Sequence, residues 1–157
     1  MEPRINAKEI GHEAYRTMLG FSSYLAKCTI EKKLQHLIEF RVSQINQCAY
    51  CLDMHSKDLR AEGESEQRLY MISAWRDSPV YTERERAALA WAEAVTELRD
   101  GEVSDAVYEE AKKEFSDQEL IDLTMVVLSI NNWNRLNIAF RTEAGGYQPG
   151  QWVSAGG

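Results

Sequence analysis

The sequence predicts an all-α protein, a compact domain of about six to eight helices, and three observations point to that class. Ser, Thr or Asn is followed three residues later by Glu at several places, which is typical of helix starts. Apolar residues recur at the three- and four-residue spacing of a helix, and strand-like alternation is scarce. With 157 residues, the chain is expected to form a single domain over residues 1–157.

The first two helices are predicted from a cap and from an apolar stripe. Asn6, with Glu9 three residues later, predicts a helix of about 15 residues that ends near Gly20. A second helix is expected over residues 29–46, because its apolar side chains fall on one stripe. These side chains are Leu34, Leu37, Ile38, Val42 and Ile45.

The middle of the chain predicts two more helices. One begins near Cys48 and stops at Gly63, since glycine is favoured just after a helix end. Ser65 is a suitable cap for a short helix that runs to about Trp75.

The next segment predicts a helix with an apolar face and then a shorter one. Thr82 and Glu85 form a capping box, and Gly101 is expected to end the helix that they start. A short helix is expected over residues 104–115. The predicted apolar face of the first helix comprises Ala87, Trp91, Ala94, Val95 and Leu98.

The last helix is predicted to be long. Ser116 and Glu119 form a further capping box, and the apolar spacing continues to about Phe140. The glycine-rich tail after Arg141 is expected to be irregular.

Composition excludes several classes of partner and location. The net charge of −7, with no basic cluster, argues against a nucleic-acid partner. No apolar run approaches the length of a membrane span, and the start lacks the apolar segment of a secretory signal. We therefore expect a cytoplasmic protein without a membrane partner. In that reducing compartment a C-x-x-C pair indicates metal binding or redox catalysis.

Cys48, Cys51 and His55 carry the chemistry that the sequence predicts. On a helix that begins near Cys48, the three side chains project to one side. A helix N-terminus favours the thiolate, and His55 is placed to hold or relay its proton. A second thiol three residues away closes a disulfide once the first is oxidised to sulfenic acid. The pattern is therefore typical of a thiol peroxidase, and a reversible Cys48–Cys51 disulfide is expected.

The stretch CAYCLDMH, preceded by LIEFRVSQINQ, resembles the carboxymuconolactone decarboxylase superfamily and, within it, the alkylhydroperoxidase D-like branch. The resemblance implies an all-helical fold assembled as homotrimers or homohexamers, and a peroxidase that acts on hydroperoxides. It implies that Cys51 attacks the peroxide, that Cys48 resolves the intermediate and that His55 relays protons. A thiol or lipoyl-type compound is expected as the reductant, and no cofactor or metal is expected.

Two positions depart from the family pattern. The family has a glutamate twelve residues before the first cysteine, where this chain has His36, and a histidine just before the second, where it has Tyr50. Because an imidazole accepts a proton near neutral pH, His36 is a candidate replacement for the missing carboxylate. Glu39, one turn later on the same helix, is the other candidate base.

Other interpretations of these residues stay open. The cysteine pair is also compatible with half of a zinc site or with inert core thiols, and His36 with a helix-surface residue. Two other functions compete with the peroxidase: a lactone decarboxylase or isomerase of the same superfamily, and a non-catalytic redox-sensing oligomer. Cys28 is expected to be a structural residue that takes no part in the reaction.

Overall fold

A computed structural model describes residues 2–151, and every regular element in that range is a helix. The predicted all-α class is therefore confirmed. No helix of this range is long and apolar enough to cross a membrane. The elements are the α-helices α1 (Ala7–Ile10), α2 (His12–Leu25), α3 (Lys32–Ile45), α4 (Ala49–Ala61), α5 (Glu66–Met71), α6 (Glu83–Glu97), α7 (Asp105–Glu114) and α8 (Asp117–Phe140), with 3-10 helices η1 (Ile72–Asp77) and η2 (Arg99–Gly101).

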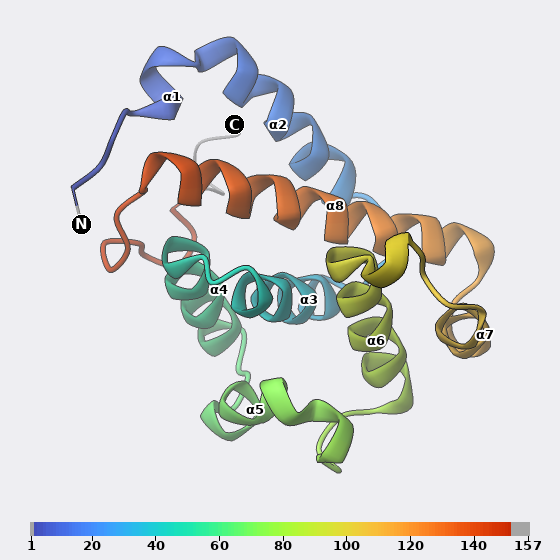
Figure 1. Ribbon diagram of the computed structural model, residues 1–157. Helices are drawn as coiled ribbons and strands as arrows, with labels where there is room; N and C mark the ends of the chain where they lie inside the picture. Colours follow the sequence, from blue (N-terminus) through green and yellow to red (C-terminus); the bar gives the residue numbers. More distant parts are fainter. Residues whose placement is uncertain (1, 152–157) are drawn as a thin grey trace.

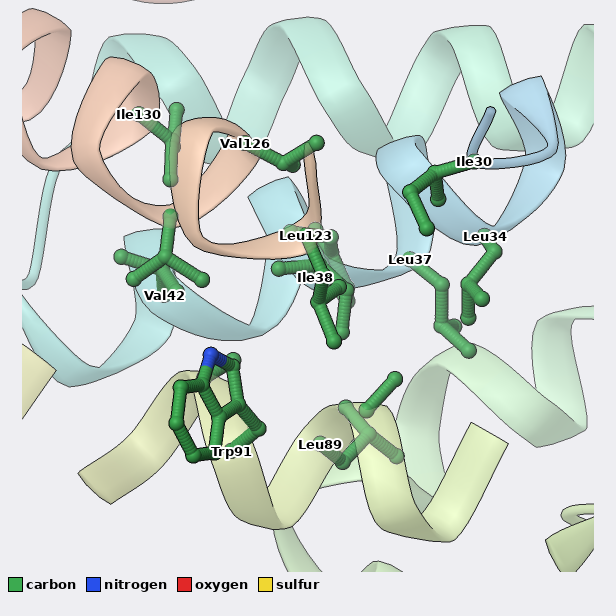
Figure 2. Packing of buried hydrophobic residues seen from close by; sticks show 14 of the residues in the cluster. Ile30, Leu34, Leu37, Ile38, Val42, Leu89, Trp91, Leu123, Val126 and Ile130 are labelled. Carbon is green, nitrogen blue, oxygen red and sulfur yellow. The ribbon is translucent and has the colours of Figure 1, made fainter. Parts of the chain in front are cut away.

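The long helix α8 is the element on which the others are arranged (Figure 1). In the picture α1 and α2 lie along one side of it, and α3, α4 and α6 lie on the other. Helix α3 packs against α4, α6 and α8, so it has the most central position. Figure 2 shows the apolar side chains of these helices pointing toward one another. Those labelled from α3, α6 and α8 are Leu34, Leu37, Ile38, Val42, Leu89, Trp91, Leu123, Val126 and Ile130.

Reciprocal caps fix the starts of α6 and α8 where the sequence predicts them. Thr82 Oγ1 accepts the backbone N–H of Glu85 at 3.2 Å, and the Glu85 carboxylate accepts the N–H of Thr82 at 2.8 Å. Ser116 and Glu119 make the same pair of bonds at 3.3 and 2.8 Å. Each pair satisfies backbone N–H groups that otherwise have no partner inside the helix. Both predicted capping boxes are therefore confirmed.

The predicted end of the first helix is wrong. Asn6 caps α1 by accepting the N–H groups of Lys8 and Glu9, but α1 stops at Ile10 and α2 continues through Gly20 to Leu25. A Cβ at Gly20 would meet nothing within 4 Å, so this glycine lies in an open part of the helix surface. Burial of Leu25, which is only 5% exposed, favours the extra turns over the weak helix propensity of glycine.

The predicted apolar face of α6 is confirmed in part, because Ala87 and Val95 are partly buried and pack against the core. Trp91 is buried as expected, but Leu98 is half exposed, adopts a left-handed conformation and ends the helix before Gly101. The face that meets α3 and α8 consists of Ala88, Leu89, Trp91, Ala92 and Glu93. The position of α6 against its neighbours, rather than its own apolar pattern, selects this face.

The irregular tail lies across α4. Lys57 Nζ donates to the carbonyls of Gly145 and Tyr147 at 3.1 and 3.0 Å. The Tyr147 hydroxyl donates to the Asp58 carboxylate at 2.9 Å, and its ring is 5% exposed. Tyr147 therefore packs within its own chain rather than offering a surface to a neighbour. Trp152, the other aromatic residue of the tail, lies outside the described residues.

Candidate functional site

The start of α4 places the two sulfurs together. Cys48 is the N-cap residue, and its Sγ accepts the backbone N–H of Cys51 at 3.4 Å. The Cα atoms lie 5.4 Å apart and the two sulfurs are bonded as a disulfide. Each cysteine is only 1% exposed. The predicted helix start is confirmed, and the pair lies where the helix dipole favours a thiolate.

Helix α8 anchors the turn that leads into this site. The side-chain amide of Asn46 donates to the Oδ1 atoms of Asn131 and Asn134, each at 2.9 Å. Asn134 Nδ2 donates in turn to Ser43 Oγ at 3.0 Å, and the backbone N–H of Cys48 donates to the Ser43 carbonyl at 3.0 Å. Because these side chains are largely buried, the network holds the α3–α4 turn in one position on α8.

His55 lies one turn beyond Cys51 and is buried with the pair, at 5% exposure. Its Nδ1 is 3.5 Å from Glu39 Oε2, which is longer than a normal hydrogen bond, and neither ring nitrogen has a hydrogen-bond partner among the described residues. Burial lowers the pKa of His55 to about 3, and the neighbouring His36 and Lys32 add to that effect. His55 is therefore a neutral imidazole at physiological pH.

Glu39 faces His55 from α3. Its side chain is 15% exposed, and burial raises the pKa of its carboxyl group, while His36 and Lys32 oppose the rise. A carboxylate with a raised pKa holds a proton more readily near neutral pH. Glu39 is thus a carboxylate in contact with the His55 ring.

His36 has a different partner. Its Nδ1 lies 2.9 Å from Glu62 Oε2, and its ring centroid is 6.1 Å from that of His55. With 8% exposure, His36 is a buried residue, so the alternative of a plain surface histidine is wrong. The structure brings His36, Glu39 and His55 into one cluster, with Glu39 in the direct contact with His55.

Two contacts of the site were not predicted. Glu62, the partner of His36, has no signal in the sequence beyond its place at the end of α4. Asn137 approaches from α8, and its side-chain amide donates to Cys51 Sγ at 3.5 Å. Asn137 is the third of three asparagines that follow one another every three residues from Asn131. Helical periodicity places residues with this spacing on one side of α8, so the pattern was a usable signal.

A groove of about 690 Å³ opens near the site between α3, α4, α5 and the tail. Its lining includes the immediate sequence neighbours of Glu39 and His55, and its apolar part comes from aromatic and leucine side chains. The lining residues are Phe40, Gln44, Ser56, Lys57, Arg60, Ala61, Glu66, Leu69, Tyr70 and Pro149. Neither cysteine lines the groove, and neither do Glu39 and His55.

Metal ligation was the other interpretation of the cysteine pair. Across residues 2–151, no group of three or more His, Cys, Asp or Glu side chains is arranged to hold a metal ion. Cys28, the remaining cysteine, is half-buried and receives a hydrogen bond from Gln35 Nε2 at 3.4 Å.

Residues 12–94 match the carboxymuconolactone decarboxylase family. An uncharacterized protein of Bacillus subtilis, YdfG, is 35% identical over 92% of this chain and 98% of its own. A crystal structure from Agrobacterium tumefaciens superposes with a TM-score of 0.88 at 39% identity, covering 93% of this chain and all of that one. That protein is of unknown function, and a role in antioxidant defence as an AhpD has been suggested for it. An uncharacterized peroxidase-related protein from Silicibacter has a TM-score of 0.75 at 25% identity, over 85% of this chain and 71% of its own.

Proposed function

Because the chain belongs to the carboxymuconolactone decarboxylase family and has the AhpD-like fold, we propose that it is a thiol-dependent peroxidase that reduces hydroperoxides. The observation that supports this most directly is the Cys48–Cys51 disulfide at the start of α4. Two thiols that bond to each other at a helix N-terminus are the apparatus of a dithiol/disulfide cycle. A lactone decarboxylase would not use this pair of thiols.

The cycle begins with the reduced pair. The Cys51 thiolate attacks the terminal oxygen of the hydroperoxide, an S–O bond forms as the O–O bond breaks, and the departing alkoxide takes a proton to become an alcohol. The Cys48 thiolate then attacks the sulfenic sulfur, and hydroxide leaves and is protonated to water. The products are one alcohol, one water and the disulfide.

His55 and Glu39 supply the proton path in this proposal. A neutral, buried His55 takes the Cys51 proton only in passing, because its low pKa disfavours the imidazolium. Glu39 then accepts the proton from the ring, since its Oε2 lies 3.5 Å from Nδ1. His36, which is paired with Glu62, is the competing candidate for the base.

The remaining parts of the proposal concern partners. A small thiol or lipoyl-type dithiol returns the disulfide to the reduced pair by thiol–disulfide exchange. The family resemblance supports a homotrimer or homohexamer. Since both cysteines are 1% exposed, the hydroperoxide and the reductant reach them only when a covering segment moves.

The test compares the wild-type protein with Cys51→Ser and Cys48→Ser. With a dithiol reductant, the wild-type protein should consume hydroperoxide continuously, and Cys51→Ser should consume none above background. Without added reductant, Cys48→Ser should consume about one equivalent and then stop, with sulfenic acid on Cys51 detected by mass spectrometry. Continued turnover by Cys51→Ser would disprove the assignment. Disulfide formation in the wild type without turnover would instead favour the redox-sensing role.

A further inference from the structure

A line of asparagines on α8 ends at the reactive sulfur. Asn131, Asn134 and Asn137 are spaced three residues apart. Asn131 and Asn134 accept from Asn46 in the α3–α4 turn, and Asn137 donates to Cys51 Sγ at 3.5 Å. The first two therefore hold the backbone that leads to the cysteines, and the third contacts a reacting atom.

We infer that Asn137 is a further catalytic residue, whose side-chain N–H stabilises the Cys51 thiolate in the reduced protein. This inference rests on the proposed dithiol cycle. The two sulfurs accept hydrogen bonds from different donors. Cys48 Sγ accepts the Cys51 backbone N–H, and Cys51 Sγ accepts an N–H of the Asn137 side-chain amide. The sulfur that attacks the peroxide is thus given a donor of its own from another helix.

The physical reason lies in the surroundings of Cys51. A cysteine that is 1% exposed has almost no water to stabilise a thiolate, so burial favours the neutral thiol. The hydrogen bond from a neutral N–H group to the sulfur becomes stronger when the sulfur is charged. The amide itself is uncharged, so no second charge has to be buried.

The charged and titratable groups that surround the pair come from α3 and α4. Those that the contacts connect to it are Lys32, His36 and Glu39 on α3, and Cys48 and His55 on α4, while α8 contributes the neutral Asn137. Glu39 and His55 act on the proton, whereas Asn137 has the side-chain bond to the Cys51 sulfur itself.

The experiment measures the pKa of the Cys51 thiol directly, in a Cys48→Ser, Cys28→Ser background under reducing conditions. The rate of alkylation by iodoacetamide is followed from pH 5 to 10, with and without Asn137→Leu. Loss of a hydrogen bond to a charged group should raise the measured pKa by about 1, so alkylation near neutral pH should slow about tenfold. Asn137→Asp, which keeps the shape but presents a carboxylate to the sulfur, should raise the pKa at least as far.

Asn132→Leu is the matched control, because Asn132 lies on the same helix and is exposed. It should leave the alkylation profile unchanged. The inference is overturned if Asn137→Leu alkylates like the parent protein, if Asn132→Leu has the same effect, or if Asn137→Asp leaves the thiol pKa unchanged. Alkylation does not require peroxide turnover, so a shifted pKa in a protein without peroxidase activity would retain this role for Asn137 and reject the proposed function alone.

Discussion

Oε2 of Glu39 lies 3.5 Å from Nδ1 of His55 across the contact between α3 and α4, and both side chains are buried. Burial affects the two groups in opposite senses, because it raises the pKa of the carboxyl group and lowers that of the imidazole to about 3. Both groups are driven toward their neutral forms. In the proposed cycle, the pair therefore passes a proton without holding a buried charge for long.

The first prediction concerns which residue is the base. Glu39→Gln should lower peroxide turnover about a hundredfold, the lower end for loss of a general base, whereas His36→Gln should retain most of it. In the wild type, activity should fall as the pH falls through the raised pKa of Glu39, because the carboxylate must be ionised to accept a proton. The measurement is the pH profile of hydroperoxide consumption for the three proteins.

The opposite outcome identifies the other candidate. If His36→Gln loses about a hundredfold while Glu39→Gln retains turnover, His36 has taken the place of the family glutamate. His36→Glu should then restore part of the activity and extend it to lower pH, because a carboxylate stays ionised about two pH units lower than an imidazole.

The second prediction concerns stability and pH. The folded protein holds His55 neutral with a pKa of about 3, whereas in the unfolded chain it titrates near its usual value. Below that value the unfolded chain binds the proton and the folded state does not, so His55 should lower the free energy of unfolding by up to about 1.4 kcal/mol per pH unit. Between pH 6.5 and 5 the loss should be about 2 kcal/mol, and His55→Gln should lack it.

Urea unfolding at a series of pH values checks this. His12→Gln is the control, because the His12 side chain is 70% exposed. Equal slopes for the wild type and His55→Gln would contradict a buried neutral imidazole at this position.

The third prediction concerns Glu93, a buried carboxylate that connects α6 to α3. Glu93 on α6 accepts from Arg41 Nε on α3 at 2.7 Å and from Trp75 Nε1 at 2.9 Å. Burial alone would raise the pKa of Glu93, but the hydrogen bonds from Trp75, Arg41 and Arg76 outweigh it and lower the pKa. Glu93→Gln leaves the largely buried Arg41 without its counter-charge, so the protein should lose about 3 kcal/mol of stability.

Urea unfolding at neutral pH measures this loss. Glu97→Gln is the matched control on the same helix, because Glu97 pairs with an Arg99 side chain that is 81% exposed and should contribute little. A Glu93 variant as stable as the Glu97 variant would show that the ion pair does not support the position of α3.

The sequence by itself determined the helical class, the starts of α6 and α8, and the joint position of Cys48, Cys51 and His55. These features depend on groups within a few residues of one another. The bond from Ser116 to the Glu119 backbone, for example, is made within one helical turn. Such local bonds form in the same way wherever the helix packs, and for that reason the pattern of residues is enough to predict them.

The tertiary structure alone decided the length of α2, the buried face of α6 and the partners of the reactive groups. Glu39 and His36 lie one turn apart on α3 and are equally good candidates in the sequence, yet only the packing of α3 on α4 puts Glu39 beside His55 and turns His36 toward Glu62. Asn137 reaches Cys51 from 86 residues away. Contacts of this kind depend on how whole helices settle against one another to bury their apolar sides, and no local spacing contains that information.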